Sequence, residues 1–75
     1  MDTDQKIELL VELAQEVEVT DPIDWGMLAV SETEAYRMMA MGVLETFPDE
    51  KIEIQAVITK LTVENFVLNL KLMQR

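Results

Sequence analysis

Three glutamates spaced four residues apart, Glu8, Glu12 and Glu16, are the side chains whose spacing is best suited to chemistry. On a helix this spacing places their carboxylates on one face, one turn apart. Carboxylate oxygens are ligands for divalent cations, and an acidic face also attracts a basic partner. We interpret the three residues as a solvated face and a candidate partner surface, and we predict no metal site.

Groups that could act as nucleophiles or general bases are few. Ser31 opens an S-x-x-E pattern, which favours a role as a helix cap. Tyr36 and Lys60 have no activating neighbour in the sequence. The chain has no histidine and no cysteine, which excludes zinc sites built on those ligands, thiol nucleophiles and histidine bases. We therefore predict a protein that is not an enzyme and has no catalytic residue and no cofactor.

The balance of charges narrows the class of partner. Fifteen acidic residues against six basic ones give a formal net charge of −9. Such a chain is repelled by phosphate backbones and anionic lipids, so we expect neither nucleic acid nor a membrane as a partner. The alternative function that this charge favours is an acidic decoy, which would occupy the basic groove of a nucleic-acid-binding host protein.

Hydropathy indicates a location inside the cell. The longest apolar run, residues 38–44, is much shorter than the about 20 residues that span a bilayer. Residues 1–4 include two aspartates where a signal peptide would be basic, and no apolar segment follows them. We therefore predict a cytoplasmic protein.

Apolar residues recur at helical spacing along most of the chain. We predict helical segments over residues 4–18, 22–29, 32–47 and 49–73. Asp2 or Thr3 is the expected cap of the first segment, and Asp21 with Pro22 marks the start of the short second one. One continuous helix over residues 22–47 is the alternative for the middle of the chain.

Residues 49–73 decide the fold class, because they are rich in the β-branched residues typical of strands. Polar and apolar residues alternate over 51–56, but the phase of the alternation then changes with no glycine or proline to allow a turn. A helix places most charges of this segment on one line: Glu53, Lys60, Glu64, Lys71 and Arg75. On that line Lys60 and Glu64 are spaced to form an ion pair. We therefore predict an all-α fold.

The predicted architecture is a single helical domain over residues 1–75, an antiparallel bundle of three helices or of three helices plus one short one. Its long last helix has apolar residues on two sides. One side has the a/d spacing of a coiled-coil seam: Ile54, Ile58, Leu61, Asn65, Leu68 and Leu72. The shorter helices of the same chain can cover one side of the first half of this helix, and they leave the C-terminal part of the seam exposed.

The apolar composition predicts a partner for this seam. A chain of this size buries only about 60% of the surface that its unfolded form exposes, and 49% of its residues are apolar. We therefore predict a protein–protein interaction module that forms a homo-oligomer through the seam, with a homodimer as first choice. A helix of a different protein would fit the seam equally well, and the sequence leaves this alternative and the direction of pairing open.

Three further features have two interpretations each. Asn65 either pairs with its symmetry mate in a dimer or faces water at the edge of the seam. Trp25 either covers the end of the bundle, which we favour, or anchors a partner. Met38, Met39 and Met41 either fill the core, which we favour, or form a deformable recognition surface.

Two stretches of the chain resemble small uncharacterised proteins of large tailed phages that infect marine cyanobacteria. They are residues 59–75 (TKLTVENFVLNLKLMQR) and residues 21–36 (DPIDWGMLAVSETEAY). The resemblance implies a context only: a protein made in the cytoplasm of an infected host cell, where a host protein would be its partner. No fold, activity or functional residue follows from it.

Overall fold

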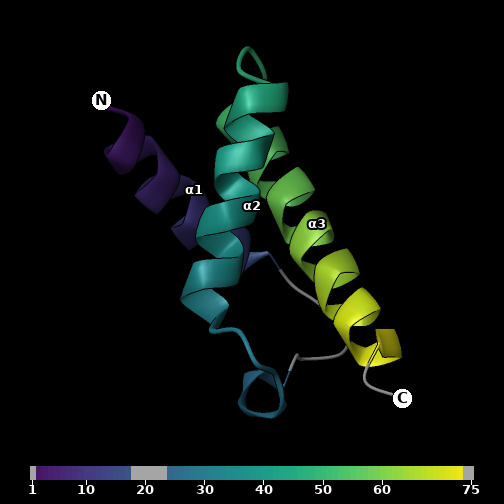
Figure 1. Cartoon of the computed structure of the whole chain (residues 1–75). Coiled ribbons are helices and arrows are strands. Elements are labelled where there is room, and N and C mark those ends of the chain that lie inside the picture. Colours follow the sequence, from purple (N-terminus) through teal and green to yellow (C-terminus); the bar gives the residue numbers. More distant parts are fainter. Residues whose placement is uncertain (1, 18–23, 74–75) are drawn as a thin grey trace.

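The structure, a computed structural model, describes residues 2–17 and 24–73. Three α-helices pack against one another in this part of the chain, α1 (Thr3–Glu16), α2 (Glu32–Thr46) and α3 (Ile52–Met73) (Figure 1). The described residues contain no strand, which confirms the predicted all-α fold. None of their helices combines the length and the apolar character that crossing a membrane requires.

The ends of the three helices lie within three residues of the predicted ends. α1 ends at Glu16, because Val17 has an extended backbone. α2 ends at Thr46, since a proline at position 48 disfavours helical dihedrals at Phe47. α3 begins at Ile52 rather than at residue 49, because residues 48–50 form the turn that follows α2.

The middle of the chain is less helical than predicted. Residues 28–31 are not helical, so the alternative of one continuous helix over 22–47 is wrong. The predicted short helix over 22–29 is reduced, within the described residues, to a 3-10 turn, η1 (Trp25–Met27). The predicted start of that helix at residues 21–22 lies outside the described part of the chain.

Local hydrogen bonds explain where α1 and α2 begin. The Asp2 carboxylate accepts a 2.8 Å bond from the Gln5 N–H, and the Gln5 side chain accepts one of 3.2 Å from the Asp2 N–H. This reciprocal capping box satisfies donors that the first helical turn leaves free. At α2 the Ser31 hydroxyl accepts a 3.1 Å bond from the Glu34 N–H, as its position in the S-x-x-E pattern predicts.

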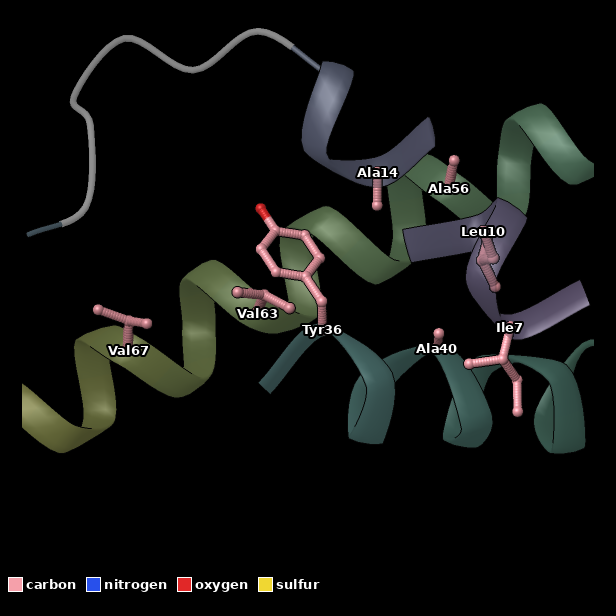
Figure 2. Close-up of a cluster of buried hydrophobic side chains, with 8 residues drawn as sticks. All are labelled: Ile7, Leu10, Ala14, Tyr36, Ala40, Ala56, Val63 and Val67. Carbon is pink, nitrogen blue, oxygen red and sulfur yellow. The ribbon is translucent and has the colours of Figure 1, made fainter. Parts of the chain in front are cut away.

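The core consists of one stripe of buried side chains from each helix (Figure 2). The stripes are Ile7, Leu10 and Ala14 from α1, Tyr36 and Ala40 from α2, and Ala56, Val63 and Val67 from α3. The small alanines let the helix axes approach closely. Tyr36, the largest fully buried side chain, fills the space between the helices.

The connection between α2 and α3 is short and held by hydrogen bonds. The Gln55 side-chain amide is buried and donates a 2.8 Å bond to the Phe47 carbonyl. One turn later the Thr59 hydroxyl, also buried, donates a 2.8 Å bond to the Gln55 carbonyl. These bonds satisfy polar groups that burial would otherwise leave without a partner. The Gln55 bond also ties the start of α3 to the end of α2.

α3 therefore has one buried side and one exposed side. Val63 and Val67 face the other two helices and belong to the core. A helix turns by about 100° per residue, which places Leu61 and Leu68 on the far side of α3. The fold thus turns these two leucines of the predicted seam away from the rest of the chain.

Candidate protein interaction surface

The face of α3 that points away from α1 and α2 is apolar and exposed to solvent. The exposed fractions are 59% for Leu61, 56% for Leu68 and 52% for Leu72. Single exposed apolar side chains are ordinary, but a row of them along a helix indicates an interaction site. We call this row the α3 stripe: Ile54, Val57, Leu61, Leu68 and Leu72, each more than 40% exposed.

Val57 is a member of the stripe that the sequence analysis missed. It is 45% exposed and lies about 40° from Leu61 around the helix. The predicted seam contained Ile58 instead, which is only partly exposed and lines a hollow toward α2 with Met39 and Thr62. Spacings of three and four residues fit both positions, so only the packing of α2 against α3 distinguishes them.

Asn65, the polar residue of the predicted seam, is exposed at the edge of the stripe. It lies about 40° from Leu61 on the side opposite Val57, one turn before the exposed Asn69. In the single chain its amide faces water, as the edge interpretation expects. Pairing of two Asn65 amides requires a second copy and stays a prediction.

Charged side chains follow only one edge of the stripe. Glu53 and Lys71 are exposed and lie on the same line of α3, five helical turns apart, with Glu64 between them. The opposite edge carries Thr62 and Asn69, which are uncharged. The stripe therefore has a charged edge and an uncharged edge.

Two open hollows border the stripe, one on each side. The hollow between α1 and α3 is lined by Glu16 and Glu53 next to Val57. The hollow between α2 and α3 is lined mainly by apolar side chains, among them Met38 and Phe47. A partner that covers the stripe would thus meet two carboxylates on the α1 side and apolar surface on the α2 side.

The prediction that the methionines of α2 fill the core is wrong for two of the three. Met38 is 59% exposed and Met41 is 48% exposed, and only Met39 packs against the core. The reason is that α2 is covered by the rest of the chain on only part of its circumference, although it is apolar nearly all round. Met38 and Met41 line different hollows, so they do not form one methionine patch.

The three glutamates of α1 remain a solvated face in the single chain. Glu8, Glu12 and Glu16 are all exposed. Successive members are about 6 Å apart along the helix axis, and within the described residues no group of three acidic side chains converges to hold a metal ion. Their candidate role is limited to the acidic partner surface.

Trp25, the other member of the candidate partner surface, packs against the core from η1. Its ring centre is 6.3 Å from that of Tyr36, with the two planes inclined at 47°. Tilted aromatic pairs at this separation are favourable. The indole therefore covers part of the core, as the first of its two interpretations expects.

The structure brings together Tyr36 and Lys60, which the sequence treats as unrelated. The Lys60 ammonium donates a 2.6 Å hydrogen bond to the Tyr36 hydroxyl and lies 5.3 Å from the centre of its ring. Lys60 is only 7% exposed, although the sequence places it on one line of α3 with Glu53, Glu64 and Lys71. The stem of Lys60 reaches past the core to a polar partner on α2. No sequence pattern indicates this contact, because 24 residues separate the pair.

Comparison with protein families, curated proteins and solved structures finds no match to the chain.

Proposed function

We propose that the protein is a non-enzymatic protein–protein interaction module that self-associates through the α3 stripe to form a homodimer. The observation that carries this proposal is the row of exposed leucines on the side of α3 that faces away from its own chain. Burial of apolar area drives most protein association. A second stripe of the same kind is a matching partner, because the same apolar surface then covers itself.

The proposal takes the chain as an antiparallel bundle with α1 and α2 on one side of α3. The connection over residues 47–51 supports this arrangement. A loop this short usually joins two neighbouring helices that run in opposite directions. The stripe then lies on the outside of the bundle and is accessible along its whole length.

A charge in the stripe tests the proposal. Leu61→Glu is expected to turn the dimer into a folded monomer, because Leu61 is exposed in the single chain and a charge there is buried only on association. Met41→Glu is the matched control, since Met41 is 48% exposed on α2 and away from the stripe. Gel filtration with circular dichroism separates loss of association from loss of folding. Dimers with both variants would contradict the proposal, and a native complex with a different protein would indicate a heteromeric partner.

A second candidate function is an acidic decoy for a basic, nucleic-acid-binding host protein, in the cytoplasm of a phage-infected cell. The exposed row Glu8, Glu12 and Glu16 supports it. Capture of a host protein at low salt that is lost at high salt is the expected result, because exposed charges are screened by salt. Unchanged capture by the Glu8→Gln, Glu12→Gln, Glu16→Gln triple variant would contradict it.

A further inference from the structure

The two ends of the α3 stripe differ in charge. The end near Ile52 has Glu53 on the charged edge and Asp49, Glu50 and Lys51 just before the helix, so three carboxylates outweigh one ammonium there. The other end has Lys71, the basic residue of the last turn of α3. A second copy therefore meets different surroundings according to the direction in which its own α3 runs.

We propose that the two copies of α3 run antiparallel, with Ile54 of one copy opposite Leu72 of its partner. This inference rests on the proposed self-association. The pairing is centred near Val63, the midpoint between Ile54 and Leu72. A shift by one heptad would move the partner by about 10 Å and leave one end of each stripe in water. Full coverage of the apolar row thus selects this register among the antiparallel ones.

Charge selects the antiparallel direction over the parallel one. Antiparallel pairing places Lys71 of one copy level with residue 55 of the other, between Glu53 and Val57 and at the hollow that these two residues line with Glu16. Parallel pairing brings the two acidic ends together instead. Eighteen residues of helix, about 27 Å, separate the ends of the stripe. This length exceeds the screening distance of about 8 Å in physiological salt, so antiparallel pairing removes most of the repulsion between the acidic ends. The dipoles of the two helices are opposed in this arrangement, which also favours antiparallel pairing.

Two residues near the midpoint also bear on the direction: Glu64 opposes antiparallel pairing, and Asn65 fits either direction. Antiparallel pairing brings the two Glu64 side chains toward each other on the charged edge, which opposes the two attractions between Lys71 and the acidic hollow. Parallel pairing would instead set two Asn65 amides opposite each other. Asn65 is exposed at the uncharged edge, where water satisfies its amide in either direction.

The absence of cysteine from the sequence makes disulfide crosslinking a direct test. The variants Ile54→Cys and Leu72→Cys are oxidised separately and as an equimolar mixture, with one variant labelled with ¹⁵N. A disulfide requires Cα atoms within about 7 Å. In the antiparallel dimer only the mixture brings two thiols this close, because two copies of either position lie about 27 Å apart. Glu12→Cys on the exposed face of α1 is the control for random collisions.

The expected result is a crosslinked species that contains one labelled and one unlabelled chain, at a yield at least several-fold above that of each variant alone and of the Glu12→Cys control. Efficient crosslinking of each variant with itself would overturn the antiparallel direction in favour of the parallel one. No crosslink above the control, for variants that sediment as dimers, would overturn this pairing of α3. Sedimentation of both reduced variants as folded monomers, with the unmodified chain also a monomer, would overturn the proposed self-association itself.

Discussion

The Lys60 ammonium donates a 2.6 Å hydrogen bond to the Tyr36 hydroxyl inside the bundle, and this bond joins α3 to α2. Both residues are buried. A buried cation whose hydrogen-bond partner is a neutral hydroxyl stabilises a fold only weakly, because burial removes its hydration. The pair therefore fixes the position of α3 more than it raises stability.

Substitutions of the two partners are expected to have unequal effects. Tyr36→Phe should lower the free energy of unfolding by about 1–3 kcal/mol, because it leaves the buried ammonium without its acceptor. Lys60→Met should lower this free energy by less, because it leaves a buried hydroxyl rather than a buried charge without a partner, while methionine keeps the apolar stem. Urea unfolding measures the free energy for both variants. The protein concentration is kept the same throughout, because association makes the apparent stability depend on it. A larger loss with Lys60→Met than with Tyr36→Phe would contradict this account of the pair.

Two valines on opposite sides of α3 provide a matched pair of tests. Val63 is fully buried in the core, whereas Val57 is 45% exposed in the stripe. Val63→Ala should lower the free energy of unfolding by roughly 1–3 kcal/mol. Val57→Ala should change the stability of the monomer by less than about 0.5 kcal/mol and weaken the dimer. Unfolding in the Leu61→Glu background and sedimentation in the native background separate the two effects, and equal effects on unfolding would contradict the assigned faces.

The glycine in α2 is expected to be replaceable. A Cβ added at Gly42 would meet no atom within 4 Å, so the position has open space. Gly42→Ala should raise the free energy of unfolding by roughly 0.5–1 kcal/mol, because alanine favours the helix. Thermal unfolding by circular dichroism measures the change. A fall in stability would show that another segment packs closely on this side of α2.

Neutralising Glu64 should strengthen the dimer. In the antiparallel arrangement Glu64→Gln removes a repulsion between like charges and is expected to lower the dissociation constant about twofold at low salt. Glu34→Gln, the same change on the exposed face of α2, is the control for the general reduction of negative charge. An equal or smaller effect of Glu64→Gln than of Glu34→Gln would argue against antiparallel pairing.

Local features of this fold could be predicted from the sequence because they depend on neighbouring residues. The caps at Asp2 and Ser31 follow from patterns of three or four residues, and the end of α2 follows from the proline after Phe47. The helical character of α3 follows from the phase of its polar residues. Each of these signals lies within one or two helical turns.

Contacts between helices were the part that the sequence could not provide. The choice between Val57 and Ile58 as a member of the stripe depends on how far α3 is rotated against α2, and no local pattern determines that angle. The burial of Lys60 depends on Tyr36, which belongs to another helix. The exposure of Met38 and Met41 depends on how much of α2 the other helices cover. All three require the tertiary arrangement.

Sedimentation equilibrium of the unmodified chain between about 1 and 100 μM tests the central claim most directly. Exposed apolar stripes that cover each other should give a species of about 17 kDa, twice the 8.6 kDa of one chain. The mass should fall toward 8.6 kDa on dilution, and Leu61→Glu should stay at 8.6 kDa throughout while keeping its helical content. A folded chain that sediments at 8.6 kDa over the whole range would contradict self-association through α3.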